Sequence, residues 1–169
     1  CIRDRDGTAR IWDRETGEAI RKLEVAKLIK PEGNTTLRVE SAVFSRDGKM
    51  VLTACNTGQL VLWNALNGKH LRTLDFGGKG LNYATFSPSS GFIIGAYRDG
   101  MVKIWDTAMG KILREMKAHQ GPVLHAAFSA DDTRIVTSGE DRMARVWDVK
   151  SKELLFVLEG HTDAVTCAA

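Results

Sequence analysis

The chain has 169 residues, 43% of them hydrophobic and 27% charged, with a formal net charge of +3. This is ordinary globular composition, and the length suits a single domain or part of one. No apolar run approaches the about 20 residues that cross a bilayer, and the charged residues 1–6 show no signal-peptide pattern. The basic and acidic residues are interspersed, which argues against a nucleic-acid binder with a clustered basic face.

The cysteines indicate the compartment. Cys1, Cys55 and Cys167 form no Cys-x-x-Cys pair and are odd in number. An odd count without metal-ligand spacing predicts reduced thiols, no bound metal and an intracellular, cytoplasmic protein, with the nucleus left open.

Four tryptophans mark a repeat. They lie at Trp12, Trp63, Trp105 and Trp147, at intervals of 51, 42 and 42 residues, and close the strings TARIWD, QLVLWN, MVKIWD and MARVWD. Upstream of the last three lie AVFSRDG, ATFSPSSG and AAFSADD. Their phenylalanines, Phe44, Phe86 and Phe128, follow one another at intervals of 42 residues. A period near 42 over most of the chain predicts a repeat architecture.

Each full period contains four short apolar runs separated by Gly, Asp, Ser and Asn, which predicts four β-strands. In the last full period these strands are expected at residues 123–128, 134–138, 144–148 and 154–158. A helix is expected nowhere, except within residues 26–37, where the longest repeat has its extra residues. Such sheets bury both faces by stacking radially, as in a β-propeller. The predicted regions are a partial blade at 1–25, blades at 38–75, 81–117 and 119–159, and the first strand of a further blade at 161–169.

These strings resemble the WD-repeat (Trp-Asp repeat) β-propeller family, whose repeats run from a Gly-His pair to a Trp-Asp pair. The matches to the opening are Gly160-His161 and Ala118-His119, and those to the close are Trp12-Asp13, Trp105-Asp106 and Trp147-Asp148. The resemblance implies an all-β propeller of four-stranded antiparallel blades, with about four blade-equivalents of a seven- or eight-bladed ring present. Two alternatives remain open: two copies joined head to tail into an eight-bladed ring, and a four-bladed monomer.

The family holds each blade with a His before the first strand, a hydroxyl on the second, an Asp in the next turn and the Trp. A buried imidazole or indole N–H without a partner costs about 1–3 kcal/mol. The resemblance transfers this structural set to His119, Thr137, Asp141 and Trp147 in a complete last blade, and to His161, Asp6, Trp12, Asp99 and Trp105 elsewhere. Two blades depart from it, because Gly77 and Gly95 stand at the His and hydroxyl positions of one, and Thr35 and Thr57 at the His and Asp positions of the other.

No catalytic constellation is expected. His119, Thr137 and Asp141 could suggest a catalytic triad, but they occupy blade-locking positions, so a structural role is favoured. His125 is expected to be packed or channel-facing rather than a metal ligand, and His70 to lie at the surface. The glycine-rich residues 77–80 lack the phosphate-loop pattern. The sequence therefore predicts no enzyme activity, no cofactor and no metal.

The resemblance implies that the turns between second and third strands share one face with the loops between blades. The candidate partner-binding residues there are Arg5, Asn56, Arg98 and Glu140 in the turns, and Glu40, Asn82, Leu124 and Thr166 at the first strands. Arginine suits carboxylate or phosphate partners, although each residue could equally be a solvated turn residue. The expected function is a non-catalytic protein–protein interaction scaffold that docks a peptide or protein within a larger assembly. The alternatives are a regulatory or targeting module of a multidomain enzyme, such as a kinase or ubiquitin ligase, and a nucleic-acid-binding propeller.

Overall fold

The computed structural model describes residues 7–30, 36–74 and 80–169. Within these ranges the regular structure is β-strand, apart from one short 3-10 helix, η1, at Val25–Lys27. The chain forms two compact units, Cys1–Leu81 and Asn82–Ala169. No helix of the described ranges is long and apolar enough to cross a bilayer.

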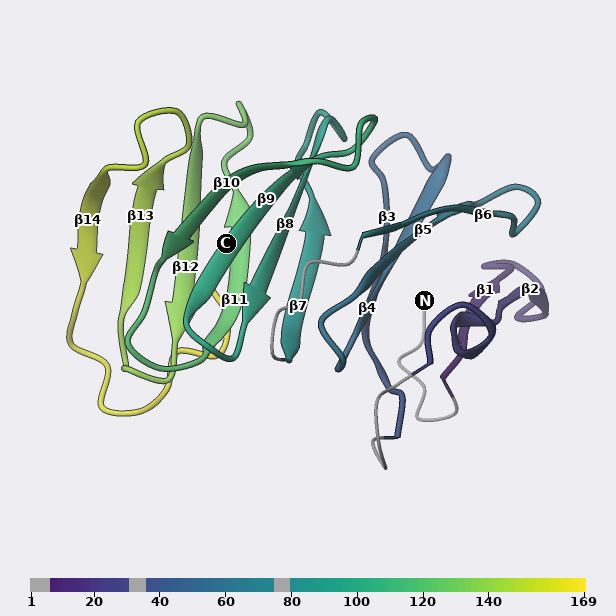
Figure 1. The fold of residues 1–169 in the computed structure, drawn as a ribbon, viewed down its shortest axis with the longest axis horizontal. Helices are drawn as coiled ribbons and strands as arrows, with labels where there is room; N and C mark the ends of the chain where they lie inside the picture. Colours follow the sequence, from purple (N-terminus) through teal and green to yellow (C-terminus); the bar gives the residue numbers. More distant parts are fainter. Residues whose placement is uncertain (1–6, 31–35, 75–79) are drawn as a thin grey trace. The chain divides into compact units, whose positions relative to one another are not determined.

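The first unit contains a two-stranded and a four-stranded antiparallel sheet (Figure 1). The smaller sheet pairs β1 (Ala9–Trp12) with β2 (Ala19–Leu23). The larger sheet has the order β3-β4-β5-β6, and its strands are β3 (Val39–Phe44), β4 (Met50–Cys55), β5 (Leu60–Asn64) and β6 (His70–Leu74). Ile11 and Leu23 share one apolar cluster with Val51, Val61 and Trp63. This cluster is the core of the first unit.

The second unit contains two four-stranded antiparallel sheets, each with its strands in chain order (Figure 1). The first consists of β7 (Leu81–Phe86), β8 (Phe92–Tyr97), β9 (Met101–Asp106) and β10 (Ile112–Lys117). The second consists of β11 (Val123–Phe128), β12 (Arg134–Gly139), β13 (Ala144–Asp148) and β14 (Leu154–Leu158). Ile94 and Ile104 of one sheet share a buried cluster with Val123, Ile135 and Trp147 of the other. The two sheets therefore pack face to face.

Burial follows the order of the strands. All residues of β4 and β8 except the first are buried, whereas β2 and β6 each bury only their last residue. None of the residues of β14 is buried. A strand covered on both faces is almost continuously apolar, as VLTAC in β4 is, whereas the outer strands β2 and β6 carry charged residues.

The structure confirms the four strands expected in the last full repeat, and β12 extends one residue further, to Gly139. The short helix η1 lies at the beginning of the longest repeat's extra residues, and it includes Val25, just outside the range where a helix was allowed. In the partial blade, β1 and β2 lie within residues 1–25, and residues 1–6 lie outside the described ranges.

Residues 161–169 differ from the prediction, because they form no strand. One backbone bond, from Val165 N to Gly139 O (3.2 Å), joins this segment to the end of β12. A strand requires a ladder of backbone bonds to a neighbour, and the described residues supply none there. The segment therefore lies beside the last sheet without extending it.

The residue after each tryptophan caps a turn. Asp13 Oδ1 accepts bonds from the backbone N–H groups of Glu15 (2.8 Å) and Thr16 (2.9 Å). Asp148 Oδ1 does the same for Lys150 (2.9 Å) and Ser151 (2.8 Å), and Asn64 takes this role after Trp63. These backbone bonds lower the pKa of Asp13 and of Asp148. The second residue of the Trp-Asp pair thus fixes the turn between the third and fourth strands.

Candidate partner-binding face

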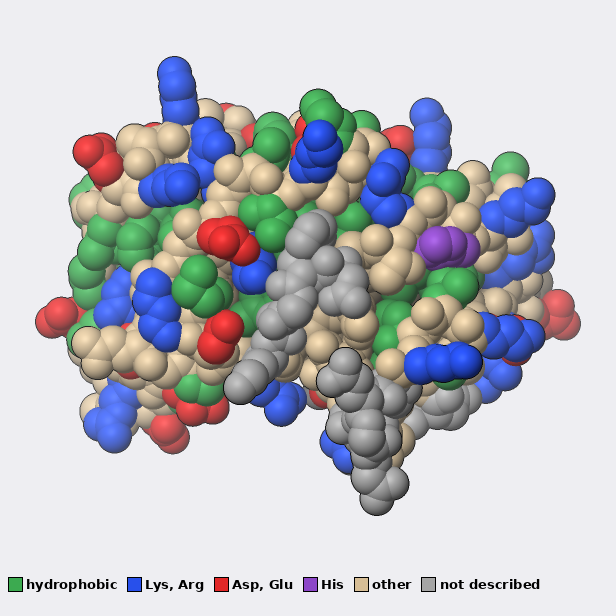
Figure 2. All heavy atoms as spheres, in the orientation of Figure 1, with side chains coloured by type: hydrophobic (Ala, Val, Ile, Leu, Met, Phe, Trp, Pro, Cys, Tyr) green, Lys and Arg blue, Asp and Glu red, His purple; other side chains and the backbone are tan. Residues whose placement is uncertain are grey.

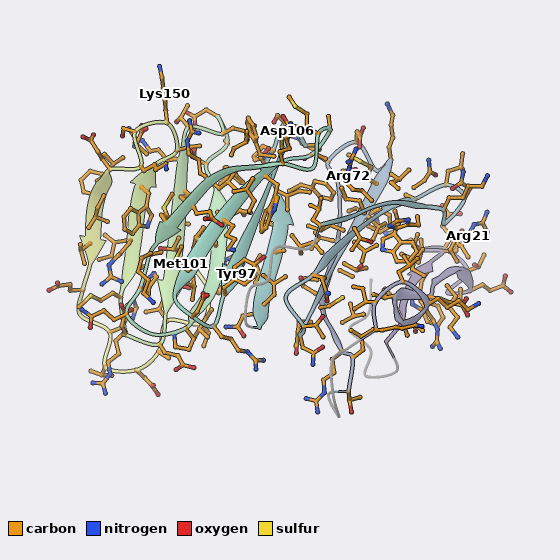
Figure 3. All side chains as sticks on the ribbon, viewed as in Figure 1. Arg21, Arg72, Tyr97, Met101, Asp106 and Lys150 are labelled. Carbon is orange, nitrogen blue, oxygen red and sulfur yellow. The ribbon has the colours of Figure 1, made fainter. Side chains whose placement is uncertain are left out.

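The turns of the second unit lie at two opposite ends, and Figure 3 labels residues at both. Tyr97 and Met101 flank the turn between β8 and β9, and Asp106 begins the turn between β9 and β10. The starts of β7 and β11 and the β12–β13 turn lie at the same end as Tyr97, because neighbouring strands are antiparallel. We call these two regions the Tyr97 end and the Asp106 end.

The last sheet is held at the Tyr97 end by a hydrogen-bonded set of four side chains. His119 Nδ1 lies 2.7 Å from Asp141 Oδ1, and His119 Nε2 lies 2.9 Å from Thr137 Oγ1. Trp147 Nε1 donates to the same Thr137 oxygen at 3.0 Å. A neutral imidazole with its proton on Nδ1 satisfies these partners, since the Thr137 hydroxyl can then donate to Nε2. The structure therefore brings together the four residues that the sequence placed in one complete set.

Arg145 on β13 adds a fifth member that sequence reasoning missed. Its Nη1 donates to Asp141 Oδ2 at 2.7 Å, and its guanidinium also stands beside the His119 imidazole. Burial lowers the pKa of His119 below its ordinary 6.5, the Asp141 carboxylate opposes this shift, and the Arg145 charge adds to it. The imidazole is therefore held neutral, as a structural group. The i,i+4 spacing of Asp141 and Arg145 is weak evidence for contact across a turn, so the sequence alone gave little indication of the pair.

The two sheets whose sequences depart from the full set, those of Trp63 and Trp105, keep parts of this arrangement. Trp63 Nε1 donates to Thr53 Oγ1 at 3.0 Å, which repeats the Trp147–Thr137 bond. Thr53 was also missed, although it stands ten residues before its tryptophan, as Thr137 does. In the Trp105 sheet, Asp99 is exposed and accepts a bond from Met101 N at 3.0 Å. Trp105 is fully buried and packs against Tyr97, with ring centroids 6.3 Å apart.

The remaining members of the set lie apart from it or outside the description. Trp12, on β1, is 39% exposed, and Asp6 lies outside the described ranges. His161 is exposed, in the segment that forms no strand.

Of the other histidines, His125 stacks on Tyr83 with ring centroids 4.1 Å apart, and burial lowers its pKa. His70 is exposed, with Nε2 2.9 Å from Thr73 Oγ1. These positions fit a packed and a surface residue, as the sequence indicated. The glycine-rich residues 77–79 lie outside the described ranges.

Two of the expected partner-binding residues meet at the Tyr97 end. Arg98 Nε donates to Asn82 Oδ1 at 3.0 Å, and Asn82 Nδ2 donates to Val123 O at 2.9 Å. Arg98 is exposed and Asn82 is half-buried. The relay joins the β8–β9 turn, the start of β7 and the start of β11.

The other expected residues of this face have different surroundings. Leu124 lies at the register shift near the start of β11, and Glu40 lies at the one near the start of β3. Such bulges redirect side chains. Glu140 and Thr166 are exposed. Asn56 binds the backbone just before β3, since Nδ2 donates to Thr36 O (2.9 Å) and Oδ1 accepts from Arg38 N (2.8 Å). Arg5 lies outside the described ranges.

The comparisons with known proteins agree with this architecture. The family model "WD domain, G-beta repeat" matches residues 27–64, 68–106 and 110–148. No curated protein matches the chain. Among solved structures, the chain is similar to a chain of "Crystal Structure of Mitotic Checkpoint Complex", with a TM-score of 0.81 and 18% identity. That alignment covers 95% of this chain and 48% of the other, so this chain spans about half the length of the protein it matches. At that identity the likeness shows a common fold.

Proposed function

Because the chain belongs to the WD domain, G-beta repeat family, we propose that it is a non-catalytic scaffold that docks a protein or peptide partner at the Tyr97 end of the second unit. The main support is that exposed side chains there stand on turns whose backbone is fixed. Glu140 N donates to Pro122 O at 3.1 Å, and Ala118 N donates to Gly100 O at 2.9 Å. A side chain on a fixed frame loses little conformational freedom on binding.

The hydrogen-bonded set supports the absence of catalysis in this proposal. His119 and Thr137 are 2% and 0% exposed, and their polar atoms bind Asp141 and Trp147. A general base must reach the substrate proton that it abstracts. This imidazole is enclosed by its own sheet, so its role in the proposal is to hold the last blade together.

Position-specific photocrosslinking tests the docking proposal. A photoreactive residue replaces Leu124 at the Tyr97 end in one variant and Lys150 at the Asp106 end in the other. From the Leu124 position we expect discrete crosslinked proteins, and excess unlabelled chain should compete them away. The Lys150 position should give none of these crosslinked proteins. Identical crosslinks from both positions would overturn the proposed face.

A further inference from the structure

The Arg98 guanidinium at the Tyr97 end is oriented by a relay that ends on the neighbouring sheet. Arg98 Nε donates to Asn82 Oδ1 (3.0 Å), and Asn82 Nδ2 donates to the Val123 carbonyl of β11 (2.9 Å). An exposed arginine normally samples many rotamers, and fixing one costs side-chain entropy. Here the amide of Asn82 directs Nε inward, so part of this ordering has taken place before a partner arrives.

An apolar residue follows the end of the relay. Leu124 comes directly after Val123 and lies at the register shift of β11, where it is half-buried. A bulge turns a side chain out of the regular alternation of a strand. The Tyr97 end therefore combines an oriented guanidinium with an apolar side chain that lies one residue beyond the last acceptor of the relay.

The surrounding charges favour a single carboxylate over an extended polyanion. Exposed charges of both signs lie at this end: Asp99 adjoins Arg98, Lys117 Nζ donates to the Asp99 carbonyl, and Glu140 and Arg142 share the next turn. Because acidic side chains stand between the basic ones, this end offers separate cations rather than a continuous basic surface for a chain of phosphates, and one acidic side chain can pair with the guanidinium. A peptide with an isolated acidic residue fits this distribution better than a nucleic acid does.

From these contacts we infer that Arg98 binds the carboxylate of an acidic residue in a peptide partner, whose adjacent apolar residue packs on Leu124. This assignment rests on the proposed docking function and gives it a partner chemistry. The guanidinium fork pairs with a carboxylate through two parallel N–H bonds, which a lysine cannot reproduce. Asn82 acts as a positioning residue, because it touches Arg98 and not the partner.

The test measures binding of short fluorescein-labelled peptides to the full chain by anisotropy. The probes have a central glutamate, glutamine or phosphoserine between leucines. We expect the glutamate peptide to bind most tightly, and Arg98→Met to weaken it about three- to tenfold. Lys150→Met, which removes one exposed charge at the Asp106 end, serves as the matched control and should leave binding unchanged.

Further variants separate recognition from a purely structural role. Arg98→Lys should weaken binding nearly as much as Arg98→Met, with unchanged melting temperatures. Asn82→Leu should weaken binding and also lower the melting temperature, since it removes the bond to Val123. Binding that the control variant reduces equally, that Arg98→Lys retains in full, or that only the phosphoserine peptide shows would overturn the carboxylate assignment. Loss of this assignment with Leu124 crosslinks intact would leave the docking proposal standing.

Discussion

The His119 imidazole connects segments of the last sheet that are far apart in sequence. Its two nitrogens contact the β12–β13 turn through Asp141 and strand β12 through Thr137, and Thr137 passes the contact on to Trp147 of β13. Each polar atom in the set would be costly without its partner, because it is removed from water. The hydrogen bonds among these buried polar side chains therefore fix this end of the sheet.

Replacing His119 by alanine should destabilise the chain by about 1–3 kcal/mol, because Thr137 and Asp141 each lose a partner at a site closed to water. Denaturant unfolding followed by tryptophan fluorescence measures this change. Glu140→Ala, an exposed change in the next turn, is the control and should be nearly neutral. Equal unfolding midpoints for the two variants would contradict a structural role for the set.

Acidification should weaken the fold through the same imidazole. The folded chain holds the pKa of His119 below 6.5, mainly by burial, so the unfolded chain binds more protons once the pH falls below about 6.5. The stability is therefore present above this pH and declines as the pH drops through it. Melting temperatures at several pH values should show the decline, and His119→Gln should make it shallower. His125, whose pKa burial also lowers, contributes to the decline in the same direction.

At the scale of the elements, two turns differ in how closely another backbone segment approaches them. Gly100, in the β8–β9 turn, has φ +83° and receives bonds from the N–H groups of Ala118 and His119. A Cβ atom at this position would lie 2.3 Å from the His119 carbonyl oxygen. Gly48, in the β3–β4 turn, has φ +70° with nothing within 4 Å of such an atom. The two glycines share a conformation and differ in their surroundings.

This pair gives a prediction with an internal control. Gly48→Ala should cost only the left-handed strain, about 1–2 kcal/mol. Gly100→Ala should cost clearly more, because the backbone of the next blade's entry loop has to move. Parallel denaturant titrations of the two variants compare these costs directly. Indistinguishable losses of stability would show that the close approach at Gly100 has no energetic weight.

For the molecule as a whole, the most exposed apolar surface on a regular element is β14. It is an edge strand, and its residues Leu154, Leu155, Phe156, Val157 and Leu158 are 43, 38, 57, 41 and 49% exposed. Figure 2 shows hydrophobic side chains along the edge where Figure 1 places β14. An apolar edge strand with unpaired backbone groups is a template for association with another chain.

We therefore expect the 169-residue chain to self-associate through β14. Light scattering on a sizing column should show a molar mass that rises with concentration, and Phe156→Lys should lower it. Leu66→Lys is the control, because Leu66 is 82% exposed in a turn rather than on a strand. A mass that stays monomeric at all concentrations, or that both variants lower equally, would contradict the prediction.

Local pattern was sufficient for some features and insufficient for others. The strands of the last repeat followed from spacing, and the contact of Thr137 with Trp147 was expected from the resemblance to WD repeats. Arg145 and Thr53 were missed, although Thr53 had a spacing signal. The strand expected at 161–169 was wrong, since apolar pattern indicates that a segment can pair and not whether a partner strand is present.

The sequence by itself determined the repeat and the all-β class, because both are encoded in spacings along the chain, and its resemblance to WD repeats indicated the residues that hold the last blade. Only the tertiary structure decided which hydrogen-bond partners the turn side chains find. Arg98 reaches Asn82 and, through it, Val123 of the next sheet, whereas Asn56 at the corresponding turn binds the backbone of Thr36 and Arg38, just before the first strand of its own sheet. Equivalent positions thus differ in their hydrogen-bond partners, because these depend on the final geometry of the sheets, which a period of 42 residues does not specify.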